Sequence, residues 1–210
     1  APPNGSGFLS LYSLPIFAVF IIACLITAIS LNAPIATSAA SQSDSTTLSP
    51  IFTKEVQYWR DDILRWADAS SLDPNLVAVI MQIESCGDPF ARSSAGAIGL
   101  FQVMPFHFQS HENPYNPDTN ALRGLNYLAR SLDASYGNVR LALAGYNGGI
   151  GIISRSEWTW SAQTLRYVYY GAPIYEDARS GNTSSPKLDE WYGKYGAGMC
   201  RRADRNLGLK

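Results

Sequence analysis

From residue 51 onward, hydrophobic residues recur at intervals of three and four, which is the spacing of one face of an α-helix. Around Trp59 and Trp66 this spacing predicts that both indole rings pack in a core. Runs of alternating apolar and polar residues, which would indicate paired strands, do not occur in a convincing form. The pattern therefore predicts a mostly α fold. Further helices are predicted over Asn120–Ser135, Asn138–Tyr146 and Ser161–Tyr170.

Another amphipathic helix ends in an acidic residue that shares its apolar face. Asp73 can cap this helix, and Pro74 suits its first turn. Leu76 and Ile83 belong to an apolar stripe that continues into Glu84. Burial disfavours the charged form of a carboxyl group and raises its pKa, which makes Glu84 a candidate general acid for glycoside chemistry. A glutamate at a helix end is more often solvated or ion-paired, so this interpretation needs the support of other motifs.

The N-terminal part of the chain has a different composition. The first 43 residues contain no Asp, Glu, Lys, Arg or His, and Leu14–Leu31 is almost wholly apolar. Because such a run can cross a bilayer, residues 1–33 are predicted to be a membrane anchor. Two alternatives stay open: Ser38-Ala39-Ala40 could mark the cleavage site of a signal peptide, and Cys24 could be the lipid-attachment site of a lipoprotein. The anchored form would be a single-pass cell-membrane protein with its folded part outside the cytoplasm.

The remaining sequence divides into three parts. Residues 34–50 are rich in Ser and Thr and nearly uncharged, which predicts a linker. Residues 51–180 carry the helical patterns and are predicted to form a catalytic domain. Residues 181–210 are predicted to be a Gly-rich, basic C-terminal tail in contact with solvent.

Composition narrows the possible functions. The net charge of −1 gives no support for nucleic-acid binding. Twelve Tyr and five Trp suit contacts with sugars, because aromatic rings stack well on sugar faces. His107 and His111 have no third ligand nearby, and no Cys-x-x-Cys pair, dinucleotide motif or phosphate-binding loop occurs. The sequence therefore predicts neither a metal nor a cofactor.

Two of the three cysteines are candidates for a disulfide. Cys24 lies within the apolar segment, whereas Cys86 and Cys200 follow it. Outside the cytoplasm disulfides persist, so we expect Cys86 and Cys200 to pair. Two free thiols are the alternative.

Four motifs follow one another between residues 83 and 151. They are IESCGDP, SSAGAIGLFQVMP, NPDTNALRGLNYL and LALAGYNGGIG. In this order the four motifs resemble the lytic transglycosylase family, whose fold is also seen in goose-type lysozyme. The resemblance covers residues 55 to 180 and implies a lysozyme-like helical domain. This chain departs from the family pattern at Gly145 and Gly148, where Ala is usual, and the departures remove no group that the chemistry requires.

The resemblance also implies a reaction and the residues that perform it. Glu84 would be the single catalytic acid of an enzyme that cleaves peptidoglycan between N-acetylmuramic acid and N-acetylglucosamine without water. The products would carry 1,6-anhydro ends. The residues implied to line the pocket and hold the substrate are Ser93, Gln102, Met104, Tyr146 and Asn147.

Two other functions stay open. A lysozyme-like hydrolase of the same fold would need a positioned water and usually a second acid. A membrane-tethered structural subunit of a larger complex would need no activity at all. The sequence does not identify protein partners.

Overall fold

The computed structural model describes residues 47–209, and this part of the chain is helical without a β-strand. The prediction of a mostly α fold is confirmed. The helix predicted within residues 1–33 lies outside the described residues. Within residues 47–209, no helix is both long enough and apolar enough to cross a membrane. The α-helices are α2 (Lys54–Gln57), α3 (Arg60–Ser70), α4 (Pro74–Glu84), α5 (Pro117–Ala134), α6 (Val139–Gly148), α7 (Ala162–Arg179), α8 (Pro186–Trp191) and α9 (Ala197–Leu207).

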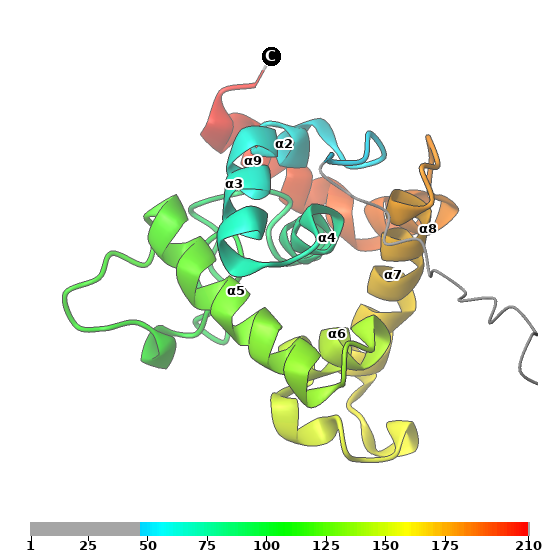
Figure 1. Cartoon of the computed structure of the whole chain (residues 1–210). Helices are drawn as coiled ribbons and strands as arrows, with labels where there is room; N and C mark the ends of the chain where they lie inside the picture. Colours follow the sequence, from blue (N-terminus) through cyan, green and yellow to red (C-terminus); the bar gives the residue numbers. More distant parts are fainter. Residues whose placement is uncertain (1–46, 210) are drawn as a thin grey trace, which may run out of the picture. The chain divides into compact units, whose positions relative to one another are not determined.

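Helix α4 lies in the centre of the helical domain (Figure 1). Its cap is the one expected, because the Asp73 carboxylate accepts a hydrogen bond from the backbone N–H of Asn75 at 2.8 Å. Every side chain from Leu76 to Met81 is buried, and α3 and α7 both pack against this helix. Packing on several sides holds α4 in place, and with it the glutamate at its end.

The two tryptophans that the sequence places in the core are buried there. Trp59 and Trp66 stack with their ring centroids 6.0 Å apart. The Trp59 indole N–H donates to the carbonyl of Gly87 at 2.9 Å. Trp59 therefore packs against α3 and also fastens the turn that follows α4.

The helices predicted after residue 116 are present, with shifted ends. Helices α5 and α6 begin after Asn116 and Asn138, whose side chains accept hydrogen bonds from the backbone N–H groups of the first turn. Helix α7 continues past its predicted end at Tyr170 and contains Pro173. The free energy gained by burying its second half, which includes Ile174, exceeds the cost of the backbone hydrogen bond that proline removes.

The C-terminal stretch is not the solvated tail predicted for residues 181–210. Residues 47–209 belong to one compact unit, and most of residues 181–209 form α8, a π-helix at Tyr192–Gly196 and α9. Trp191, Cys200 and Ala203 are buried, and α9 packs against α2. The stretch is rich in charge, but these few apolar side chains at helical spacing are enough to dock it.

The end of the predicted linker also belongs to the folded unit. Leu48 and Ser49 are buried. The Ser49 backbone N–H donates to the side-chain oxygen of Asn75 at 2.8 Å, and the Gln57 amide donates to the Ser49 carbonyl at 2.7 Å. The folded unit therefore begins before the predicted boundary at residue 51.

A disulfide in the structure pairs Cys86 with Cys200, and their Cα atoms are 5.0 Å apart. Cys86 comes two residues after the end of α4, and Cys200 lies in α9. The bond therefore fastens the C-terminal helix beside Glu84, across 114 residues of sequence.

Gly145 lies where α5 and α6 approach each other closely. A Cβ atom at this position would be 2.6 Å from Cδ1 of Ile153 and would also collide with the hydroxyl of Ser131. That buried hydroxyl donates to the carbonyl of Ala142 at 2.8 Å. The close packing around Gly145 therefore leaves no space for a side chain at this position, where the family usually has Ala.

Candidate active site

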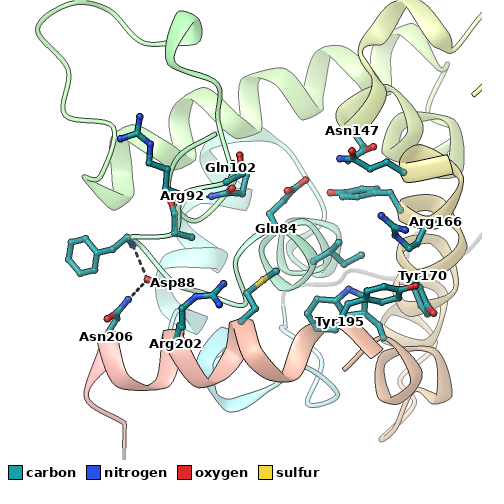
Figure 2. Close-up of a pocket in the computed structure, with 18 residues that line it drawn as sticks. Glu84, Asp88, Arg92, Gln102, Asn147, Arg166, Tyr170, Tyr195, Arg202 and Asn206 are labelled. Carbon is teal, nitrogen blue, oxygen red and sulfur yellow. Dashed lines mark hydrogen bonds between the residues drawn. The ribbon is translucent and has the colours of Figure 1, made fainter. Parts of the chain in front are cut away.

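Glu84, the last residue of α4, points into a cavity of about 510 Å³ (Figure 2). The next residue, Ser85, is fully buried, and its hydroxyl donates to the carbonyl of Leu100 at 2.7 Å. This bond joins the end of α4 to the loop that forms one wall of the cavity. The glutamate is therefore held at a defined place even though it ends its helix.

Burial raises the pKa of the Glu84 carboxyl to about 7. The hydroxyl of Tyr167, on α7, opposes this effect and lowers the pKa somewhat. Its oxygen is buried and forms no hydrogen bond of ordinary geometry among the described residues. At neutral pH a substantial fraction of Glu84 therefore carries a proton, which is the form that can donate to a leaving oxygen.

The loop over residues 93–105 is held by a buried amide. The side chain of Asn120 donates to the carbonyl of Ile98 at 2.8 Å and accepts from the backbone N–H of Phe101 at 2.9 Å. Gly99, at a φ of +77°, makes room for this amide, because a Cβ there would be 2.8 Å from its Cγ. Local glycine geometry and one buried asparagine thus shape the loop.

Gln102 and Ser93 of this loop both line the cavity that contains Glu84. Gln102 has a φ of 45°, which is uncommon for a residue other than glycine, and its side-chain amide donates to the carbonyl of Gly99 at 3.0 Å. The Ser93 hydroxyl accepts from the backbone N–H of Ala97 at 3.0 Å. Both side chains are therefore positioned by the loop's own backbone.

Helix α6 contributes a phenol and an amide near its end. The Tyr146 hydroxyl donates to the carbonyl of Phe101 at 2.8 Å, which joins α6 to the loop. Burial and the nearby charge of Glu84 raise the pKa of Tyr146 well above its usual value. The side-chain oxygen of Asn147 accepts from the hydroxyl of Thr164 at 3.1 Å. Tyr146 is therefore a neutral hydrogen-bonding group near the acid.

The six residues implied by the resemblance lie around two adjoining cavities. The first contains Glu84, Ser93, Gln102 and Asn147. Met104 and Tyr146 line a smaller cavity of about 160 Å³, which also includes Gln102 and Asn147. The two shared residues connect these spaces, so residues from the second and fourth motifs meet around the acid of the first.

One wall of the larger cavity, formed by α7 and the C-terminal helices, was not predicted from the sequence. The residues of this wall are Arg166, Tyr167, Tyr170, Trp191, Tyr195, Met199, Arg202 and Asn206. The sequence does contain a helical pattern here, because Met199, Arg202 and Asn206 recur at helical spacing. Cys200 and Ala203 lie on a separate apolar face, which is buried. The expected Cys86–Cys200 pair placed this stretch near the end of α4, but the sequence did not predict the helix that brings these side chains to the cavity.

A second acid lines the cavity, but it is engaged in hydrogen bonds within the protein. Asp88 is buried, and one of its carboxylate oxygens accepts from the backbone N–H of Phe90 at 3.0 Å and from the side chain of Asn206 at 2.9 Å. Glu84 and Asp88 are the only acids among the described residues that line this cavity. Glu84 is therefore the acid available for proton transfer.

One cluster of potential metal ligands occurs within residues 47–209. It consists of Glu55, Cys86 and Cys200. The two sulfur atoms are joined in the disulfide and cannot serve as thiolate ligands.

Comparison with known proteins gives one family match. Residues 61–164 match the family model of the transglycosylase SLT domain. That range contains all four motifs around Glu84 and ends before the C-terminal helices.

Similar proteins are named as transglycosylases. A transglycosylase of Enterobacteria phage PRD1 is 38% identical over 111 residues, which cover 52% of this chain and 40% of that protein. Membrane-bound lytic murein transglycosylase E of Buchnera aphidicola subsp. Acyrthosiphon pisum is 31% identical over 84 residues, covering 34% of this chain and 38% of that protein. Membrane-bound lytic murein transglycosylase C of Edwardsiella ictaluri is 26% identical over 145 residues, covering 59% and 40%. The chain thus spans about two fifths of the length of these curated relatives.

Among solved structures, an inactive mutant of the lytic transglycosylase Slt from Pseudomonas aeruginosa is similar. The TM-score is 0.47 at 26% sequence identity, and the match covers 57% of this chain and 24% of that one.

Proposed function

We propose that this chain, whose residues 61–164 belong to the transglycosylase SLT family, is a lytic transglycosylase that cleaves peptidoglycan strands without consuming water. The observation that carries the proposal is the single available acid. Glu84, with a pKa of about 7, lines a cavity of ordinary ligand-binding size, and the other acid in that wall is held by two hydrogen bonds.

Glu84 would act first as an acid and then as a base. Its carboxyl proton passes to the oxygen between the muramoyl sugar and the next N-acetylglucosamine, and the bond from that oxygen to C1 breaks. The carbonyl oxygen of the muramoyl acetamido group attacks C1 from within the same sugar. The Glu84 carboxylate then removes the proton of the 6-hydroxyl, whose oxygen bonds to C1 as the acetamido oxygen leaves. Glu84 regains its proton and the product is a 1,6-anhydro sugar.

The neighbouring residues would hold the acetamido group in line for this attack. Ser93, Gln102 and Asn147 line the cavity with Glu84, while Met104 and Tyr146 lie in the adjoining one. A hydrolase of the same fold would need a positioned water and usually a second carboxylate to activate it. Asp88 is poorly suited to that task because its carboxylate is buried and already accepts two hydrogen bonds.

The product of the reaction tests the proposal. The purified protein is incubated with peptidoglycan sacculi, and the released fragments are analysed by mass spectrometry. We expect anhydro ends, and a Glu84→Gln variant that has lost at least a hundredfold of the activity, because Gln cannot donate and recover a proton. Reducing ends would assign the protein as a hydrolase. Sacculi left intact by the wild-type protein would favour a structural subunit.

The location of the reaction follows from the substrate. Peptidoglycan lies outside the cytoplasmic membrane, so the folded unit would be extracytoplasmic, tethered by residues 1–33. Two of the similar proteins are named as membrane-bound, which supports the same placement.

A further inference from the structure

The cavity around Glu84 carries unneutralised positive charge. Arg92, Arg166 and Arg202 line it, and none of the three forms an ion pair among the described residues. On the acidic side are Glu84, which is partly protonated at neutral pH, and Asp88, which accepts two hydrogen bonds. A chain with a net charge of −1 has therefore gathered three free arginines at its candidate active site.

Arg166 is held in position with its donor groups available. Its guanidinium lies over the ring of Tyr195, 5.2 Å from the centroid, and Tyr195 in turn contacts the ring of Tyr170 at 5.7 Å. Stacking uses the face of the guanidinium and leaves its in-plane N–H groups free, which is the geometry that binds a carboxylate through two hydrogen bonds.

Arg202 lines the cavity from α9 (Figure 2). Two attachments hold this helix. The disulfide from Cys200 binds it next to the end of α4, and the side chain of Asn206 donates to Asp88 at 2.9 Å. Arg202 lies between these attachments in sequence, so its backbone is restrained relative to Glu84. Helix α9 also lies outside the residues that match the SLT family.

We propose that Arg166 and Arg202 bind a carboxylate carried on the 3-O substituent of the muramoyl residue, and that the face between α7 and α9 thereby selects strands by charge. The sugar rings of peptidoglycan are uncharged. The 3-O substituent ends either in a free lactyl carboxylate or in a peptide that bears carboxylates of its own. The carboxylate of the 3-O substituent is therefore the anionic group of the strand that two arginines in a glycan-binding cavity can bind. The inference rests on the proposed function.

Binding measurements on the full chain test this without turnover. The protein carries Glu84→Gln, and three forms of the same glycan strands are compared: strands with their peptides, strands stripped to the lactyl carboxylate, and stripped strands whose carboxylate has been converted to an amide. The test variant adds Arg166→Gln and Arg202→Gln. The matched control adds Arg179→Gln and Arg201→Gln, which remove the same charge from α7 and α9 outside the cavity.

We expect the protein with an unchanged arginine pair, and the control, to bind the carboxylate-bearing strands more tightly than the amidated ones. The double substitution of Arg166 and Arg202 should reduce this preference about tenfold. Added salt should also reduce the preference of the protein that keeps both arginines. A gain for stripped strands alone would assign the lactyl carboxylate as the ligand, and a gain for peptide-bearing strands alone would assign the peptide. Equal gains would mean that the arginines accept a carboxylate from either source. Equal affinity for all three forms, or a preference that survives the double substitution, would overturn the inference.

A separate cleavage assay with Glu84 intact distinguishes this failure from failure of the proposed function. Anhydro products from amidated strands, without any charge preference in binding, would leave the proposed function standing and reject the arginine pair. Neither arginine is among the groups that shift the pKa of Glu84, so the pH midpoint of cleavage should not move in the double variant. A moved midpoint would mean that the arginines act on the acid and would count against their role in carboxylate binding.

Discussion

Glu84→Gln should stabilise the fold while it removes activity. The carboxyl has a pKa of about 7 in the folded protein against 4.5 as the ordinary value, so its ionised form is disfavoured by folding. The difference of 2.5 pH units, at 1.36 kcal/mol per unit, corresponds to about 3 kcal/mol. This value is an upper bound, because the side chain is partly accessible to water through the cavity.

The effect has a definite pH dependence. Below pH 4.5 the carboxyl is protonated in both states and causes no loss of stability. As the pH rises to about 7 the unfolded chain ionises first, so the wild-type protein loses stability relative to the variant, and above about 7 the difference is constant. At pH 8 we expect the variant to unfold about 5–10 °C higher than the wild type.

Urea unfolding of both proteins at pH 4, 6 and 8 measures this difference. Glu176→Gln is the control, because it removes one carboxylate from the exposed surface of α7 and should change the stability by no more than about 0.5 kcal/mol. A Glu84→Gln protein that is no more stable than the wild type at pH 8, or whose gain is equally large at pH 4, would refute the reasoning from burial.

Three further predictions concern other parts of the chain. Gly145→Ala should cost about 1–3 kcal/mol of unfolding free energy in thermal or urea denaturation, because its Cβ would collide with the buried hydroxyl that faces α6, whereas Gly151→Ala, which has open space around its Cα, should be tolerated. Reduction of the Cys86–Cys200 disulfide should lower the melting temperature, since a bond that closes a loop of this length stabilises by about 4–5 kcal/mol in the chain-entropy model. Reduction should also expose two thiols in addition to that of Cys24, and the same two thiols reacting in an oxidised, denatured sample would contradict the pairing. Membrane fractionation with a carbonate wash should leave the full chain in the membrane, whereas a soluble product that begins near Ser41 would identify a cleaved signal peptide.

The helical class and the position of the candidate acid could both be predicted from the order of residues along the chain. Helical spacing, the cap at Asp73 and the apolar stripe of α4 are local properties, because each depends on residues within a few turns of one another. Their local nature explains why α4 was predicted correctly and why Glu84 could be recognised as a carboxyl directed toward a core.

The surroundings of that acid depend on how distant helices pack together. Arg202 reaches the cavity because α9 is joined to the end of α4 across 114 residues, and Arg166 because α7 packs along α4. The expected cysteine pair indicated that the C-terminal stretch lies near α4, but its charge predicted a tail, because no spacing rule in a single sequence reports how α7 and α9 pack around the acid. Three-dimensional packing also sets the value of the Glu84 pKa, since desolvation depends on every element that encloses the side chain.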